Sequence, residues 1–211
     1  MIENNIRQRT ETKRFNPEIK INMILSKLGK IGGERQFSEK NSLDWTKLNR
    51  DVEFFIKDTI RFGENPKEII DIFWDKFRNK ASHSKIFNSN DEFENYKVGI
   101  LAEVAIEKSL SLISIDASYA SPERDVEDGC DVLINPGNKN EICCQIKTTR
   151  DTNRNRKSDV RFDLSDSGTR AMLEMNYQDG IDIFYDSSTG EPTEILKDLL
   201  SKELRNSNLL N

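Results

Sequence analysis

The sequence predicts a two-part α/β protein, in which a helical N-terminal region precedes a domain with a mixed β-sheet flanked by helices. Apolar residues recur at helical spacing in the first 90 residues, most clearly from Ile69 to Phe77. Beyond them, short apolar runs bounded by turn residues alternate with helical segments, as in an α/β domain. The chain is 211 residues long, so it can hold two small units. We place the division between residues 1–90 and 91–211.

The N-terminal region begins with a polar arm up to about Pro17. Gly63 marks a break between two helices, and Pro66 suits the first turn of the next one. Both tryptophans and the phenylalanine cluster are expected in a core rather than in base stacking. Residues 81–90 are expected to form a linker that contains the only histidine, His83, to which we assign no ligand or catalytic role. The predicted helices cover residues 19–30, 44–62 and 66–80.

For the second region, residues 91–211, the sequence predicts both helices and strands. Its last helix should bury Ile195, Leu196, Leu199 and Leu200. The predicted order is helix 91–110, strand 112–117, irregular loop 118–130, strands 131–135 and 141–149, basic loop 150–159, strand 160–164, short helix or loop 166–177, strand 181–186 and helix 192–204.

A β-hairpin in this region places polar residues together. Two apolar runs, 132–134 and 142–146, flank a turn at Pro136 and Gly137. Side chains alternate along a strand, so Gln145 and Lys147 share one face with Glu141 and Cys143. Folding the hairpin back would bring Asp131 beside the end of the second strand. A carboxylate, an amide oxygen and an ammonium group could therefore converge.

Such a convergence suits metal-assisted cleavage of a phosphodiester. Mg²⁺ prefers oxygen ligands, and it can activate water and stabilise charge on phosphate oxygens. A neighbouring lysine can orient the water or stabilise the developing charge. The alternative interpretation is a surface ion pair between adjacent strands, which contributes under about 1 kcal/mol.

The stretch from about Tyr96 to Glu194 resembles the PD-(D/E)xK nuclease superfamily, in the variant that has Gln before x-Lys. It is most similar to the Mrr-like and homing-endonuclease-like branches, and the resemblance covers about half of the chain. Its motifs are a helix over 98–108 with Glu103, then Asp131, then Gln145 to Thr149, and a later strand at 180–186 followed by a helix. Cys130 stands where the family has proline.

The resemblance implies a restriction-endonuclease-like fold and Mg²⁺-dependent cleavage of DNA, with Mn²⁺ as an alternative ion. Asp131 would be the central metal ligand, and Gln145 and the Ile146 carbonyl would add neutral oxygens. Gln145 brings no charge, so Glu103 is the candidate second carboxylate, with an ordinary solvent-edge glutamate as the alternative. Lys147 would orient the attacking water. The N-terminal region would serve target recognition or a homodimer, since one site cuts one strand.

Charge is unevenly distributed along the chain, whose net charge is -5. Residues 1–90 hold 18 Lys and Arg against 13 Asp and Glu, whereas residues 91–211 hold 14 against 24. One basic island follows Lys147 within this acidic half, and local potential governs contact with phosphate. We expect the island to bind nucleic acid, with a solvated loop as the alternative. The expected contacts are Arg150, Arg154, Arg156, Lys157 and Arg161.

Three cysteines, Cys130, Cys143 and Cys144, are too few for a disulfide framework and badly spaced for zinc. The adjacent pair should place one residue in the core and one in a cleft. With neither a membrane span nor a signal peptide expected, the sequence predicts a cytoplasmic protein. Two rival functions stay open, namely an RNA endonuclease with the same fold and a non-catalytic nucleic-acid-binding module.

Overall fold

The computed structural model describes residues 15–31, 39–150, 158–178 and 180–210. The chain divides into two compact units, residues 1–94 and 95–211. Helix α5 (Asn90–Leu112) spans the residues at which the units meet in sequence.

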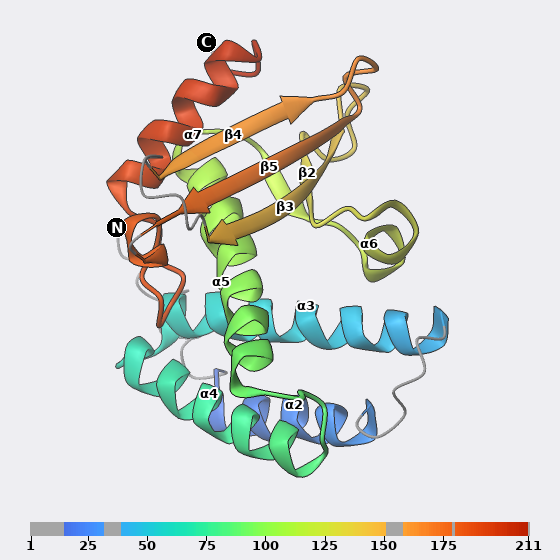
Figure 1. Cartoon of the computed structure of the whole chain (residues 1–211), viewed down its shortest axis with the longest axis vertical. Coiled ribbons are helices and arrows are strands. Elements are labelled where there is room, and N and C mark those ends of the chain that lie inside the picture. The colour runs from blue at the N-terminus through green and yellow to red at the C-terminus, as the bar shows by residue number, and fades with distance from the viewer. Residues whose placement is uncertain (1–14, 32–38, 151–157, 179, 211) are drawn as a thin grey trace, which may run out of the picture. The chain divides into compact units, whose positions relative to one another are not determined.

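The described part of the N-terminal unit contains the helices α2 (Pro17–Ile31), α3 (Glu39–Phe62) and α4 (Pro66–His83) (Figure 1). Each of them packs against the other two. Their core is aromatic, as the sequence predicts; the rings of Phe55 and Phe73 lie 4.8 Å apart, and Trp74 and Phe77 are buried beside them. Large rings supply much of the buried apolar area that holds such a small bundle together.

The predicted position of His83 in a linker was wrong. His83 ends α4 instead of lying in a linker, and its Nδ1 lies 2.6 Å from the backbone oxygen of Asn79, one turn earlier. The connection to α5 is therefore only residues 84–89.

The second unit is built on a mixed sheet, which confirms the α/β class. Its strands lie in the order β1-β2-β3-β5-β4. Neighbouring strands are antiparallel except β3 and β5, which run parallel (Figure 1). The strands are β1 (Ala117–Tyr119), β2 (Val132–Ile134), β3 (Ile142–Arg150), β4 (Asp159–Leu164) and β5 (Arg170–Tyr177).

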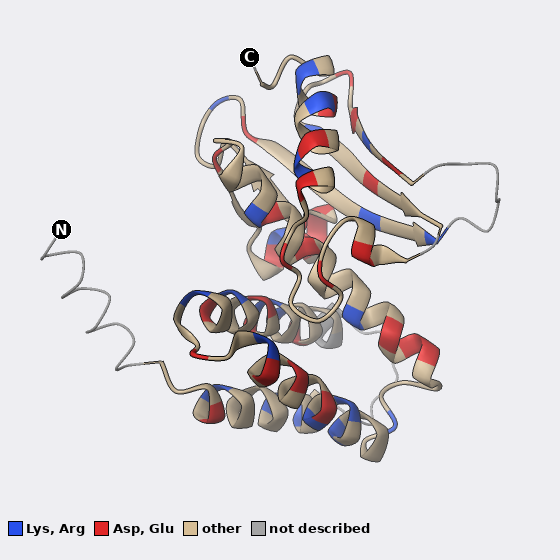
Figure 2. Cartoon of the chain, turned by 90° about the vertical axis from the view of Figure 1, so that its left-hand side faces the viewer, with Lys and Arg blue, Asp and Glu red and all other residues tan. Residues whose placement is uncertain are grey.

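The two faces of the sheet differ in chemistry. One face is apolar and buried, with Cys144, Phe162 and Leu173 among its residues. Helix α7 (Glu194–Asn206) packs against β4. By strand alternation and register, the other face carries polar and charged residues. Figure 2 shows where charged residues occur along the strands. On this polar face, β3, β5 and β4 contribute Gln145, Lys147, Arg170, Glu174, Arg161 and Asp163.

Helix α5 is held to the segment that follows β5. The hydroxyl of Tyr185 donates to the backbone oxygen of Val98 at 2.9 Å, and the ammonium of Lys108 donates to Glu191. Gly190 has φ of +74°, and a Cβ there would lie 3.1 Å from the Leu101 carbonyl. Glycine therefore permits both the turn and the close approach of the helix.

Several predicted elements in this unit were wrong. Residues 166–177 contain strand β5, and residues 181–186 contain a 3₁₀ helix (Ile181–Ile183) instead of the later strand of the family pattern. Residues 112–117 are mainly the end of α5 and a turn, with β1 starting at Ala117. The loop expected over 118–130 contains helix α6 (Pro122–Asp128).

Helix α7 was predicted in the right place but not with every buried residue. Leu196, Leu200 and Leu204 are buried at a four-residue spacing, whereas Ile195 is 48% exposed and Leu199 half-buried. The helix presents a narrow stripe to the sheet, so a residue one step along from Leu196 faces away.

Candidate functional site

The predicted hairpin is present and fixes the position of Asp131. Strands β2 and β3 pair antiparallel, with Val132 opposite Cys144 and Ile134 opposite Ile142. Between them the chain turns at Asn135 and Gly137, both with positive φ. Asparagine and glycine tolerate this conformation better than other residues, so the local sequence favours the turn.

Asp131 is bonded to β3 through both its backbone and its side chain. Its amide donates to the Cys144 carbonyl at 3.0 Å, and its Oδ2 accepts from the Ile146 amide at 2.7 Å. The pairing of β2 ends at Val132 while β3 continues to Arg150. The Asp131 carboxylate therefore takes the place of a strand carbonyl for Ile146, and it lies at the centre of the Gln145 to Lys147 motif.

The register of β2 and β3 also determines where Gln145, Lys147 and the Ile146 carbonyl lie relative to Asp131. Extended by one residue, it places Asp131 opposite Gln145, so both lie on the polar face with Lys147 two residues further on. The amide and carbonyl of one strand residue point to the same edge. Since the Ile146 amide meets Asp131, the Ile146 carbonyl also points to the edge where Asp131 lies.

Glu103 and Lys147 differ in their surroundings. Glu103 is half-buried on α5 beside the fully buried Ala102 and Val104, while Lys147 is exposed. Within the described residues, no group of three or more His, Cys, Asp and Glu side chains is placed to hold a metal ion.

Helix α6 borders the hairpin and was not predicted. Ser121 accepts from the Arg124 amide at its start, Pro122 occupies the first turn, and Gly129 ends it with φ of +63°. Serine and proline before a charged segment that ends at glycine are start and stop signals. They were present in the sequence but were included in a loop because the helix is only seven residues long.

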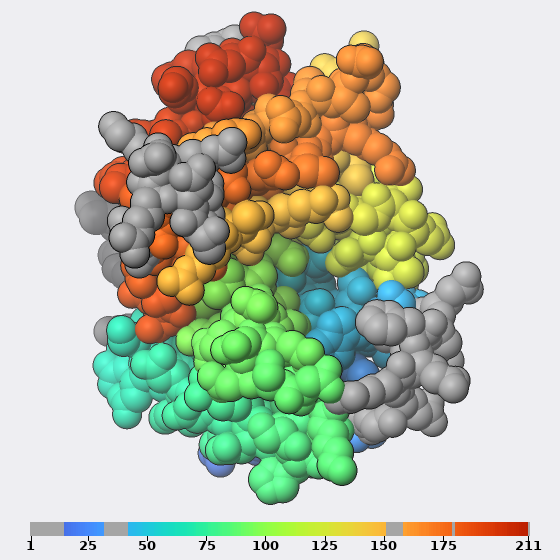
Figure 3. Space-filling model, viewed as in Figure 1, coloured from blue at the N-terminus to red at the C-terminus, as the bar shows by residue number. Residues whose placement is uncertain are grey.

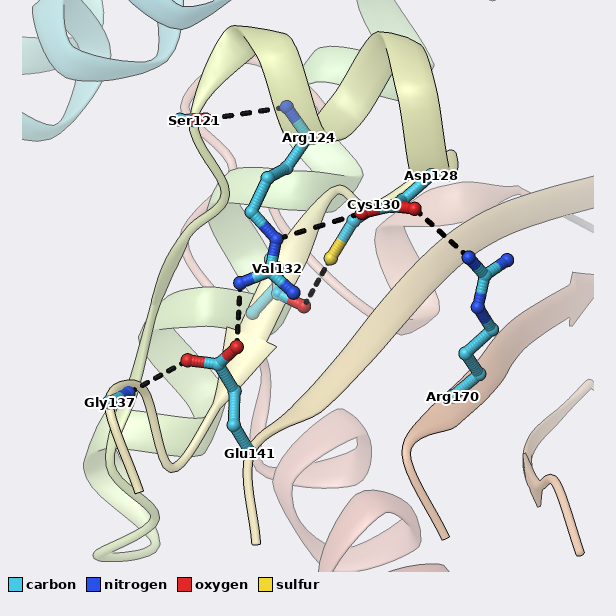
Figure 4. A network of polar contacts seen from close by, with 8 residues as sticks. All are labelled: Ser121, Arg124, Asp128, Cys130, Val132, Gly137, Glu141 and Arg170. Carbon is cyan, nitrogen blue, oxygen red and sulfur yellow. Dashed lines mark hydrogen bonds and ion pairs between the residues drawn. The ribbon is translucent and has the colours of Figure 1, made fainter. Parts of the chain in front are cut away.

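Two ion pairs tie α6 to the sheet (Figure 4). The guanidinium of Arg124 donates to Glu141 at 2.6 Å, and Arg170 of β5 donates to Asp128 at 3.0 Å. Glu141 also accepts from the Gly137 amide at 2.7 Å, so it links α6 to the hairpin turn. The Gly137 amide and then the Arg124 side chain hold the pKa of Glu141 below its usual value.

The three cysteines are free and buried. Cys144 lies in the core under the sheet, where burial raises its pKa well above the ordinary thiol value. Cys143 points to the opposite side, where it packs with Cys130, Ala120 and Leu133. As predicted for this adjacent pair, one member lies in the core and the other lines a cavity.

That cavity, which we call the Gln145 cavity, has a volume of about 320 Å³ and opens on the polar face of the sheet. Side chains of β3, β4 and β5 lie at the surface there, with α6 beside them (Figure 3). A Cβ at Gly129 would lie 3.5 Å from Nε2 of Gln145, an ordinary van der Waals distance, so Gly129 borders that amide. Within the described chain, Gln145 is the predicted catalytic residue that lines the cavity. The lining residues are Asp128, Gly129, Cys143, Gln145, Asp163, Leu164, Ser165, Arg170, Ala171 and Met172.

Two of the expected nucleic-acid contacts can be placed. Arg150 is exposed at the end of β3, and Arg161 on β4 donates to Asp159 at 3.1 and 3.2 Å. Arg154, Arg156 and Lys157 lie outside the described residues.

Comparisons with protein-family models, with curated proteins and with solved structures found no match. A search of the described helices found none of the length and apolar character needed to cross a membrane.

Proposed function

We propose that this protein is a Mg²⁺-dependent DNA endonuclease with a restriction-endonuclease-like fold. One contact carries the proposal: the Asp131 carboxylate accepts from the Ile146 amide at 2.7 Å, between Gln145 and Lys147. Those residues are the ones that resemble the PD-(D/E)xK motif. The contact brings Asp131 to the position on β3 between Gln145 and Lys147, which supports such a site.

The order of elements gives further support. Helix α5 with Glu103 comes first, then Asp131 directly before β2, then β3 with Gln145 and Lys147. The absence of a strand at residues 181–186 removes one motif of the resemblance, but that motif includes none of the proposed catalytic residues.

The donors at this edge suit a hard cation. Asp131 offers a carboxylate, and the Ile146 carbonyl points to the same edge of β3, so both could serve as oxygen ligands. Gln145 and Glu103 would complete the set as a neutral and a charged oxygen ligand. A bound Mg²⁺ or Mn²⁺ would activate water and stabilise charge on the phosphate.

The protein side chains would then position the substrate. Lys147 is exposed on the polar face, so its ammonium can reach a phosphate oxygen or hold the attacking water. Arg150 ends β3 on the face opposite to Lys147, so it would contact the nucleic-acid backbone at the end of the strand, joined by Arg154, Arg156, Lys157 and Arg161.

The proposal also includes an oligomeric state and a cellular location. A homodimer would supply two sites for a double-strand break, and the N-terminal unit would provide the dimer interface or target recognition. Three free cysteines fit a reducing compartment, so we propose a cytoplasmic location.

The test is cleavage of four substrates: supercoiled plasmid, linear duplex, single-stranded DNA and single-stranded RNA. Each is incubated with Mg²⁺, with Mn²⁺ and with EDTA. We expect metal-dependent cleavage of DNA. Cleavage of RNA alone would favour the RNA endonuclease, and binding without cleavage under any condition would favour a non-catalytic module.

A further inference from the structure

The Gln145 cavity has the wrong charge for a phosphate site. Asp128 and Asp163 line it together with Arg170, so its ionised side chains sum to a negative charge. Arg170 already donates to Asp128 at 3.0 Å, which offsets the positive charge further. A phosphate entering the cavity would meet a net repulsion. An anionic ligand is therefore disfavoured, whereas a neutral ligand with N–H groups can donate to the two carboxylates.

The cavity offers hydrogen-bond groups of both kinds around an apolar floor. The register places Gln145 of β3, Met172 of β5 and Asp163 of β4 side by side in one row. Asp163 can only accept when ionised, Arg170 can only donate, and Gln145 can do both. Met172 and Cys143 supply the apolar side chains on this face, and Ala171 and Leu164 also border the cavity. A flat ligand with donors and acceptors along its edge matches this arrangement.

The size of the cavity limits which ligands can fit in it. A volume of about 320 Å³ is near the lower end of the range for small-molecule sites, which suits a single heterocycle. Guanine presents O6 and N7 acceptors, for which arginine is the commonest partner, and N–H donors that a carboxylate can accept. Thymine lacks an amino group, and adenine lacks an acceptor at position 6. Cytosine has only its N4 amino donor, whereas the adjacent N1–H and N2–H2 donors of guanine can meet both oxygens of one carboxylate.

We propose that the Gln145 cavity binds an unpaired guanine base, with Asp163 accepting from its N–H groups and Arg170 donating to its acceptor edge. One part of this inference rests on the proposed function. It is that the guanine belongs to the nucleotide beside the phosphate held at Asp131 and Lys147. Gln145 belongs to both sites, so a base in the cavity and a phosphate at the metal edge would be neighbours. A base can enter only when it is out of the duplex stack, which favours single-stranded or mispaired DNA.

The test is a titration of the ¹⁵N-labelled full chain with guanosine, cytidine, adenosine and thymidine, followed by NMR. Guanosine should shift the amide signals of Gly129 and Ala171 and the side-chain amide of Gln145 at concentrations where thymidine does not. Asp163→Asn and Arg170→Lys should each weaken guanosine binding about tenfold or more, within the range for one bidentate base contact. The matched controls Asp198→Asn and Arg205→Lys on α7, both exposed, should bind like the wild type.

Shifts that are equal for all four nucleosides, or that map away from the cavity, would overturn the proposal. Folding of each variant is checked from the rest of its spectrum, so lost binding is separable from lost structure. The titration needs neither a metal ion nor cleavage. Guanosine binding without nuclease activity would retain the cavity and reject the endonuclease, whereas metal-dependent cleavage without guanosine binding would do the reverse.

Discussion

Replacing Asp131 should expose the Ile146 amide, and the choice of substitution separates structure from chemistry. In Asp131→Ala the amide loses the carboxylate that accepts from it at 2.7 Å. A hydrogen bond to a charged group contributes about 1.5–3 kcal/mol, and the lower value applies here because the contact is only partly buried. Asp131→Asn keeps an oxygen acceptor but no charge, so it should lose about half as much, since charge-assisted bonds are about twice as strong as neutral ones.

The assay is hydrogen exchange of the Ile146 amide at neutral pH. A loss of about 1.5 kcal/mol corresponds to roughly tenfold faster exchange in Asp131→Ala, with a smaller increase in Asp131→Asn. The amide of Met175 on β5 serves as the internal control, and Asp198→Ala on α7 serves as the control variant. Unchanged exchange of Ile146 in Asp131→Ala would refute the assignment of this carboxylate to the edge of β3. If Asp131 also ligates a metal, both variants should lose cleavage, although only the alanine variant loses much protection.

Three further predictions test the packing and the electrostatics. Leu196→Ala should lower the free energy of unfolding by about 2–5 kcal/mol because Leu196 is fully buried. Ile195→Ala should lower it by under about 1 kcal/mol because Ile195 is 48% exposed. Equal losses for the two variants in urea unfolding would contradict the orientation of α7. The lowered pKa of Glu141 stabilises the fold above the ordinary glutamate pKa of about 4.3 and stops doing so as the pH falls through the lower folded value. Glu141→Gln should therefore be less stable than the wild type at pH 7, and this difference should shrink as the pH falls below the ordinary glutamate pKa. A pH-independent difference in urea unfolding would count against the Arg124 and Gly137 contacts. Cys144 should resist iodoacetamide at pH 8 in the folded protein and react once unfolded, because burial raises its pKa; mass spectrometry that finds rapid native labelling would show that the core face is open.

Elements of the fold could be predicted from the sequence where one local signal dominated. Helices α3 and α4 have long apolar periodicity, and Pro66 marks the start of α4. The hairpin turn at Asn135 and Gly137 fixed the register of β2 and β3, and from that register followed the approach of Asp131 to Gln145. Such local determinants need no knowledge of the rest of the fold.

Strand β5 shows where local signals fail. Its residues alternate, with Ala171, Leu173 and Met175 buried, which is the pattern of a strand. However, Ala, Met, Leu and Glu are strong helix formers, and the segment is short, so the sequence suggested a helix or a loop. Its central position comes from pairing with β3 and β4 on both sides, which is a tertiary effect that overrides propensity.

The candidate site was predictable only in part for the same reason. Asp131, Gln145 and Lys147 belong to one hairpin, so spacing alone brings them near one another. Asp163 and Arg170 reach the Gln145 cavity only because β5 lies between β3 and β4, and Asp128 reaches it only because α6 is tied to Arg170. Neither arrangement follows from the spacing of residues along the chain.

The most direct test of the account is nicking of supercoiled plasmid by Lys147→Ala in Mg²⁺. Lys147 is exposed, so its loss should leave the fold intact, and Lys202→Ala on α7 is a matched control. The account predicts that the wild type and the control convert supercoiled plasmid to open circles, and that Lys147→Ala binds the plasmid but nicks it at least about a hundredfold more slowly, in the range for loss of a group that stabilises the transition state. Nicking by Lys147→Ala at the wild-type rate would contradict it.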